Sequence, residues 1–212
     1  MSDIKQATQA RRSASRPDRA RLFEIASEQS GYFTAEQARD CGFSWALLSH
    51  HVKSGHFVRV RRGLYRFHEY PSSPREHVLA AWLAVGKDVA VVSQESALDI
   101  LGLSDVIPDA VHLTVSRSRR NLPLIPGVKV HTTVKPLRPD ERVVRDGMAL
   151  TSATRSVLDA AEAGTAPEQI EMAVNQAIER GLATAQQLRQ DAAERGRRVA
   201  TLIEEALDRA QQ

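Results

Sequence analysis

The sequence predicts an α+β protein in which an N-terminal winged helix-turn-helix precedes a mixed α+β domain with a helical C-terminus. Helix caps and glycine stops alternate over residues 18–55, and a hairpin pattern rich in arginine follows at residues 56–67. Strand and helix patterns then alternate to about residue 152, after which only helical patterns remain. These observations predict domains at residues 18–70 and 75–212, preceded by a disordered basic tail at residues 1–17.

Three short helices are expected in the first domain because each pattern begins at a polar capping residue and ends at a glycine. They run from Asp18 to Gly31, from Thr34 to Gly42 and from Ser44 to Gly55. Gln37, three residues after Thr34, completes a capping box. Leu48, His51 and Val52 point inward by helical spacing, with Leu48 and Val52 four residues apart on the buried face of the third helix.

The hairpin is expected at "HFVRVRRGLYRF", residues 56–67, with its turn at Arg62-Gly63. Alternation with a period of two predicts an apolar face and a face that carries most of the arginines. The apolar face comprises Val58, Val60, Tyr65 and Phe67. Four guanidinium groups on one hairpin repel each other unless an anion joins them, so the hairpin is interpreted as a wing with phosphates as counterions.

Charge supports this interpretation. Residues 1–70 carry 12 Lys and Arg against 7 Asp and Glu, whereas the remaining residues carry 17 against 19. A basic first domain beside a nearly neutral second one indicates that the first domain meets a polyanion. The predicted double-stranded DNA contacts are Ser44, Trp45, Ser49, His50 and Lys53 on the third helix and Arg59, Arg61, Arg62 and Arg66 on the hairpin.

The second domain is expected from "REHVLAAWLAVG" onward, after a linker at residues 68–74. Helices are predicted at residues 75–86, 95–103, 152–164, 167–180, 184–195 and 197–210. Strands are predicted at residues 89–93, 110–116 and 128–134, and a hairpin at residues 141–152 turns at Asp146-Gly147. Arg155 and Asp159, four residues apart on one helix, are interpreted as an ion pair.

The sequence leaves the roles of two basic segments open. The loop at residues 116–127, with Arg117, Arg119 and Arg120, is either a second nucleic-acid contact, a docking surface for an acidic partner or a solvated loop. The tail, with Arg11, Arg12 and Arg16, is either disordered or a flexible arm for the minor groove.

Catalysis and metal binding are not expected. Pro-Asp pairs at residues 108–109 and 139–140 are typical of nuclease sites, but neither is followed by the Glu-x-Lys that completes a magnesium site. His50 and His51 are adjacent, so their side chains point about 100° apart on a helix and chelate one ion poorly. We therefore predict no enzyme activity, no cofactor and no metal. A nuclease targeted by the winged helix remains the alternative.

The protein is expected to be cytoplasmic and to have no membrane partner. Its longest apolar run, Val78–Val85, is far short of the ~20 residues that span a bilayer, and its N-terminal residues are polar. The single cysteine, Cys41, cannot form an internal disulfide.

The segment "YFTAEQARDCGFSWALLSHHVKSGHFVRVRRGLYRF", residues 32–67, resembles the N-terminal winged helix of AbiEi-type antitoxins of type IV-like toxin–antitoxin systems. The matching features are the helix start at Thr34, the helix that ends in Gly55 and the hairpin motif at Arg59–Tyr65. Residues 149–161, "ALTSATRSVLDAA", resemble a second motif of that family, in which Thr151, Arg155 and Asp159 match and Ser156 replaces threonine.

This resemblance implies two roles. The winged helix represses the protein's own operon at inverted repeats, where two copies can bind as a dimer. The C-terminal domain counteracts a cognate nucleotidyltransferase-type toxin, which modifies RNA or nucleotides, by direct or indirect means. A transcription regulator without a toxin is the other alternative to this antitoxin and autorepressor.

Overall fold

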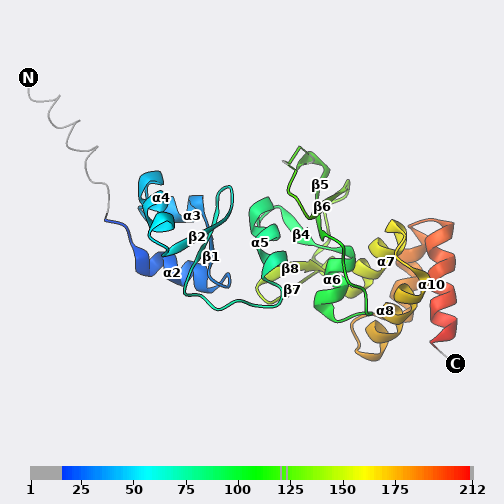
Figure 1. Cartoon of the computed structure of the whole chain (residues 1–212). Helices are drawn as coiled ribbons and strands as arrows, with labels where there is room; N and C mark the ends of the chain where they lie inside the picture. The colour runs from blue at the N-terminus through cyan, green and yellow to red at the C-terminus, as the bar shows by residue number, and fades with distance from the viewer. Residues whose placement is uncertain (1–15, 120, 123, 211–212) are drawn as a thin grey trace, which may run out of the picture. The chain divides into compact units, whose positions relative to one another are not determined.

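The structure is a computed structural model that describes residues 16–119, 121–122 and 124–210. It divides into two compact units with the boundary between Glu76 and His77 (Figure 1). The predicted basic tail falls almost entirely on residues 1–15, which lie outside the described residues. Within the described ranges, no helix is both long and apolar enough to cross a membrane.

The first unit contains three helices and a small antiparallel sheet among its described residues. The helices are α2 (Arg19–Ser27), α3 (Ala35–Asp40) and α4 (Trp45–Lys53). The strands are β1 (Tyr32–Thr34), β2 (Phe57–Arg61) and β3 (Leu64–Phe67), in the order β1-β3-β2. Helices followed by a hairpin form a winged helix-turn-helix, as predicted, although the three-residue strand β1 was not anticipated.

The predicted caps position these helices. The side chain of Asp18 accepts a hydrogen bond from the Arg21 N–H, and Ser44 accepts one from the Leu47 N–H. Thr34 and Gln37 form the complete capping box, in which each side chain accepts from the other residue's backbone N–H. Because capping oxygens satisfy helix N–H groups that have no partner within the helix, they fix where α2, α3 and α4 begin.

Aromatic side chains dominate the core of the first unit. The rings of Phe33, Phe57 and Phe67 lie 4.9–5.3 Å apart, centroid to centroid, beneath the sheet. Leu22 from α2 and Leu48 from α4 are buried against them. The helices and the hairpin therefore share one core, which holds the wing beside α4.

The hairpin's alternation differs from the prediction. Phe57, not Val58, faces the core, because Phe57 pairs with the buried Phe67 and Val58 pairs with Arg66. Val58 is 40% exposed. The register shifts between Arg59 and Arg61, so a strict period of two does not run through the hairpin. The turn lies at Arg62-Gly63 as predicted.

The first unit also includes the start of the segment that the sequence predicted to be a linker, residues 68–74. Tyr70 packs directly over Gly31, and its hydroxyl donates to the Ser27 carbonyl over 3.1 Å. Glu69 pairs with Arg19 over 2.9 Å. Residues read as the start of a linker therefore close this unit's core.

The second unit is built around a five-stranded mixed sheet (Figure 1). Its strands, β4 (Ala90–Val92), β5 (Val111–Ser116), β6 (Val128–Thr133), β7 (Arg142–Arg145) and β8 (Met148–Thr151), are ordered β6-β5-β4-β8-β7. Neighbours β5 and β6 run parallel, as do β4 and β8, whereas β4–β5 and β7–β8 are antiparallel.

Helices complete the second unit at the positions that the sequence predicted. They are α5 (Glu76–Val85), α6 (Gln94–Leu101), α7 (Ala153–Ala163), α8 (Pro167–Glu179), α9 (Ala185–Ala193) and α10 (Arg197–Arg209), with short 3-10 turns at Arg117–Arg119 and Pro139–Glu141. Helix α6 packs against β5, β8 and α7; α8, α9 and α10 pack against α7, and α10 also packs against α8 and α9. The chain is thus an α+β protein with a helical C-terminus, as predicted.

Candidate functional site

Helix α4 presents the polar row that the sequence predicted. Trp45, Ser49 and Lys53 are all exposed and follow one another at intervals of four residues, which places them along one side of the helix. His50 is exposed beside this row. Ser44 is exposed too, but its hydroxyl oxygen caps the helix. A helix that enters the major groove needs side chains along one such row that can reach the edges of the bases.

Trp45 has a neighbour that the sequence reasoning missed. The Arg39 guanidinium carbon lies 5.8 Å from the Trp45 ring centroid. Trp45 is 59% exposed, although large aromatic side chains gain most when buried. The pair puts an aromatic ring and a cation at the start of α4, where helix N–H groups and the helix dipole also favour an anion. Arg39 therefore joins the candidate interface.

His51 points inward, as predicted. Its ring centroid lies 4.8 Å from that of Phe57, and its Nδ1 atom is buried without a hydrogen-bond partner among the described residues. Burial, followed by the nearby His56 and His50, lowers the pKa of His51. The half-buried ring thus packs against the core at Phe57, and His50 alone of the adjacent pair is exposed.

The wing presents Arg59 and Arg62 to solvent, and Arg61 is half-buried. The wing tip is fixed by Gly63, whose carbonyl accepts from the Ala35 N–H over 2.8 Å. Gly63 has a φ of +77°, a left-handed conformation that suits glycine. This hydrogen bond connects the wing tip to the start of α3, and it therefore fixes the loop from which the arginines extend.

Arg66 lies differently from the prediction, which placed it with the exposed wing arginines. Its side chain is only 13% exposed, and its guanidinium donates to the Tyr70 carbonyl over 2.6 Å. The same guanidinium lies 3.6 Å from Glu76 and 5.7 Å from the centroid of the Tyr32 ring. Arg66 therefore anchors the end of the first unit. Arg66 lies on β3, the central strand of the sheet, so its backbone is held between β1 and β2.

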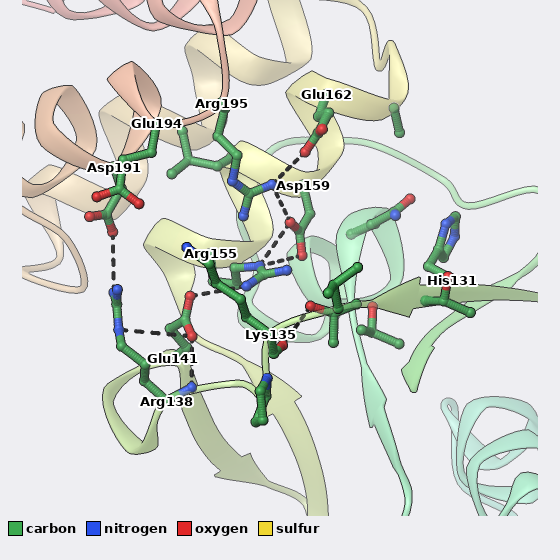
Figure 2. Close-up of a pocket in the computed structure, with 18 of the residues that line it drawn as sticks. His131, Lys135, Arg138, Glu141, Arg155, Asp159, Glu162, Asp191, Glu194 and Arg195 are labelled. Atoms are coloured by element: carbon green, nitrogen blue, oxygen red, sulfur yellow. Dashed lines mark hydrogen bonds and ion pairs between the residues drawn. The ribbon is translucent and has the colours of Figure 1, made fainter. Parts of the chain in front are cut away.

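The second unit contains a cavity of about 880 Å³ (Figure 2). Its walls come from β6 and the segment after it, from α7 and from the end of α9. The charged residues that line it are Lys135, Arg138, Glu141, Arg155, Asp159, Glu162, Asp191, Glu194 and Arg195. Cations and carboxylates are thus mixed around the same space.

An ion-pair network crosses one wall of this cavity (Figure 2). Nε of Arg155 donates to both carboxylate oxygens of Asp159 over 2.8 Å, which confirms the predicted pair. Nη1 of Arg155 also reaches Glu141 over 3.0 Å. Arg195 binds the same Asp159 over 2.7 Å and Glu162 over 2.6 Å. Asp159 therefore joins the guanidinium group of its helix neighbour Arg155 to that of Arg195, which lies 36 residues further along the chain.

Glu141 connects this network to the turn before β7. It accepts the Arg138 backbone N–H over 2.7 Å as well as the Arg155 guanidinium. Burial raises the pKa of Glu141, but these two hydrogen bonds and the positive charges of Arg155 and Arg138 together outweigh burial and lower the pKa overall. Arg138 also lies 3.8 Å from Asp191 of α9. The charged groups therefore hold the sheet against the helices.

The second motif of the resemblance, residues 149–161, is at the centre of this arrangement. Thr151 at the end of β8 and Ser156 in α7 are fully buried, and their hydroxyl oxygens lie 2.7 Å apart. Ser152 between them caps α7. With Arg155 and Asp159, these residues join β8, α7 and the C-terminal helices.

Two histidines on neighbouring strands, His112 of β5 and His131 of β6, contact each other at the cavity wall. His131 lines the cavity, and its Nε2 is 3.2 Å from Nδ1 of the buried His112 on the neighbouring strand. Burial lowers the pKa of His112, although Glu95 and Asp109 act in the opposite direction. Burial and then His112 lower the pKa of His131. Neither histidine was singled out by the sequence.

The basic loop keeps its open interpretation. Arg117 and Arg119 are exposed on the turn that follows β5, and Arg120 lies outside the described residues. The two Pro-Asp pairs are held by cations: Asp109 pairs with Lys129 over 2.9 Å and Asp140 with Arg138 over 3.3 Å.

A comparison with known protein families finds a match for the first unit. Residues 20–68 match the family model described as "Transcriptional regulator, AbiEi antitoxin". This match covers the winged helix and confirms the resemblance predicted for it. A search of curated proteins gives no match.

One solved structure resembles most of the chain. The crystal structure of the RV2827C protein from Mycobacterium tuberculosis superposes with a TM-score of 0.61 at 15% sequence identity. The similarity covers 90% of this chain and 76% of that one. It supports the fold of both units.

Proposed function

We propose, from the match of the winged helix to AbiEi antitoxin transcriptional regulators, that this protein is an antitoxin that represses its own operon. The observation that carries the proposal is the exposed row on α4 beside two exposed wing arginines, within the segment that matches the family. Its partners are operator DNA and a cognate nucleotidyltransferase-type toxin.

In this proposal α4 lies in the major groove. Ser49 and His50 contact base edges, because their short polar groups face outward from the middle of the helix. Lys53 and the cationic Arg39 bind phosphates on either side. Arg59 and Arg62 of the wing bind phosphates or enter the minor groove, where a narrow groove favours guanidinium groups. Ser44 and Trp45 contact the backbone at the start of α4.

Repression follows if two copies bind an inverted repeat. A dimer holds its second recognition helix at a high effective concentration once the first is bound, so operator symmetry increases affinity. The second unit then counteracts the toxin. Its mixed charges are mostly paired with one another, which makes it a poor binder of DNA and a suitable surface for a protein.

Binding of the full chain to DNA from its own promoter tests the first role. We expect tight binding to a duplex with the inverted repeat and much weaker binding to the same bases in shuffled order. Equal binding to both duplexes would contradict specific repression. The second role is tested in cells that express the neighbouring gene from an unrelated promoter, where co-expression of this chain should restore growth.

The alternatives give different results in the same assays. A regulator without a toxin binds its operator but has no toxic neighbour to counteract. A nuclease targeted by the winged helix cleaves the promoter duplex when divalent metal is added. Cleavage that is lost on removal of metal would therefore overturn a purely regulatory role.

A further inference from the structure

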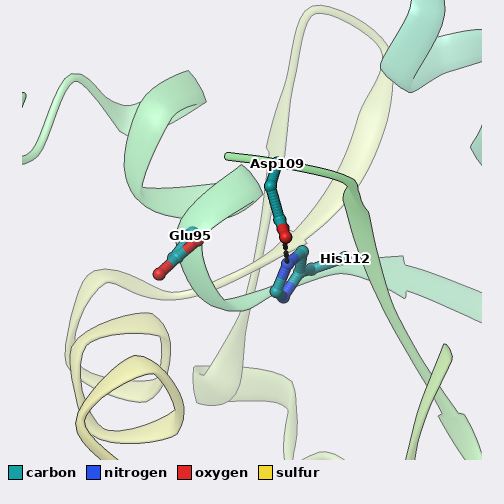
Figure 3. A group of neighbouring side chains, drawn as sticks. All are labelled: Glu95, Asp109 and His112. Atoms are coloured by element: carbon teal, nitrogen blue, oxygen red, sulfur yellow. Dashed lines mark ion pairs between the residues drawn. The ribbon is translucent and has the colours of Figure 1, made fainter. Parts of the chain in front are cut away.

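Three side chains of the kinds that bind metals meet in the second unit, and none of them lines the cavity described above. They are Glu95 at the start of α6, Asp109 in the loop before β5 and His112 on β5 (Figure 3). One ligand atom from each lies within 4.8 Å of the other two. Their side chains converge although Glu95 is distant in sequence.

The hydrogen bonds of His112 determine which nitrogen faces this group. Nδ1 of His112 lies 3.0 Å from the carbonyl oxygen Oε1 of Gln94. With its proton on Nδ1 the ring donates to this oxygen, which only accepts, and Nε2 of the neutral ring then presents a lone pair; Nδ1 also lies 3.2 Å from Nε2 of His131. The His112 side chain is 6% exposed, and Nε2 has no hydrogen-bond partner among the described residues.

This buried lone pair points toward carboxylates. Asp109 Oδ1 is 3.7 Å from Nε2, which is too far for a hydrogen bond and leaves space between the two atoms. A lone pair beside two carboxylates is unfavourable unless a proton or a metal cation lies between them. Gln94 meanwhile fixes the ring through Nδ1, as partners of metal-binding histidines commonly do.

We propose that Glu95, Asp109 and His112 bind a divalent transition-metal ion of the zinc type. A neutral imidazole and carboxylates suit zinc, and three protein ligands leave a fourth position for water. Asp109 is in a loop with its side chain 72% exposed, so it can turn toward Nε2. Lys129, now 2.9 Å from Asp109, is the cation that the metal replaces.

Metal binding would join α6, β5 and the preceding loop of the folded protein. Because the three ligands come together only in the folded state, binding contributes to folding stability. Glu95 is already positioned for this, since it accepts a hydrogen bond from Thr165 over 2.7 Å. The site therefore predicts a metal-dependent increase in thermal stability, independently of DNA or toxin.

Calorimetric titration of the full chain with zinc chloride, after dialysis against a chelator, tests the proposal. We expect the chain to bind one equivalent of zinc and to unfold at a higher temperature when zinc is bound. Asp109→Asn and Glu95→Gln should each lower the affinity for this zinc ion by about tenfold or more. His112→Gln should abolish it. Circular dichroism checks that the His112 variant folds. The Asp109 variant is expected to fold, because the Asp109 side chain is exposed.

Other histidines provide the control. His50→Ala combined with His56→Ala removes exposed imidazoles of the first unit and should leave the equivalent intact. Lys129→Met removes the competing cation and should strengthen binding. Zinc binding that survives unchanged in both Asp109→Asn and folded His112→Gln would overturn the assignment, as would complete absence of zinc binding by the unaltered chain.

Discussion

The wing of the first unit and the cavity of the second unit use arginine in opposite ways. In the first unit, Arg59 and Arg62 are exposed, and among the described residues no carboxylate pairs with either. In the second unit, Arg155 and Arg195 are each bound to two carboxylates around the cavity. The difference teaches that an arginine's partners, rather than its abundance, indicate its role. In our proposal the exposed guanidinium groups of the wing bind phosphates, whereas the paired ones around the cavity hold the fold together.

The largest expected effect concerns the paired arginines. Arg155→Ala leaves the partly buried Glu141 without its side-chain hydrogen-bond donor and the buried Asp159 with Arg195 alone, which should lower the free energy of unfolding by about 3 kcal/mol. Urea unfolding of the full chain measures this. Arg189→Ala, which breaks the exposed pair with Glu204, is the matched control and should change stability little. Equal losses in the two variants would remove the distinction between the buried network and a surface pair.

The next effect concerns sequence preference in the first unit. Ser49→Ala or His50→Ala should each change the preference among operator variants by about 1–3 kcal/mol if a base contact is lost. Lys53→Ala should lower affinity for every duplex without changing the preference. Competition titrations with single-base operator variants distinguish the two outcomes. A uniform loss in all three variants would mean that α4 does not read bases.

A smaller effect is expected from the exposed wing. Arg59→Ala combined with Arg62→Ala should weaken binding to all duplexes and reduce the salt dependence of log K by a slope of about 1 per lost phosphate contact. Titration of one duplex at several salt concentrations gives the slope. The unfolding free energy should stay unchanged, because these side chains are exposed. An unaltered slope would assign the wing to a protein partner.

The smallest effect is a dependence on pH. The hydrogen bonds that lower the pKa of Glu141 stabilise the fold above its unfolded pKa of 4.5, and this stability is lost as the pH falls through the lower folded pKa. Glu141→Gln should therefore flatten the loss of stability below about pH 4.5. Urea midpoints across acidic pH give the comparison. Parallel curves for the two proteins would show that Glu141 does not contribute.

Local signals predicted most of the elements. Thr34 with Gln37, Ser44 and Ser152 marked helix starts because capping is decided within a few residues of the chain. The hairpin phase was wrong at Phe57 and Val58, since a register shift and a third strand decide which face is buried. Propensity alone does not reveal a three-residue strand such as β1.

Long-range geometry accounts for what the sequence left out. The cavity forms only when β6, α7 and α9 meet, and the strand order that brings them together is not written in any local pattern. Arg66 was placed with the exposed wing, because its partners Tyr70 and Glu76 lie beyond the hairpin. The segment 149–161 was recognised as a motif, but the link from Asp159 to Arg195 needed the structure.

The division of labour between the units is tested most directly in the full chain. The triple variant Lys53→Ala, Arg59→Ala and Arg62→Ala changes exposed residues of the first unit only. It is measured in cells where the neighbouring toxin gene is driven by an unrelated promoter. We predict that this variant, though unable to bind the operator, restores growth as well as the unaltered protein. Failure of the folded variant to restore growth, at equal protein level, would contradict separate roles for the two units.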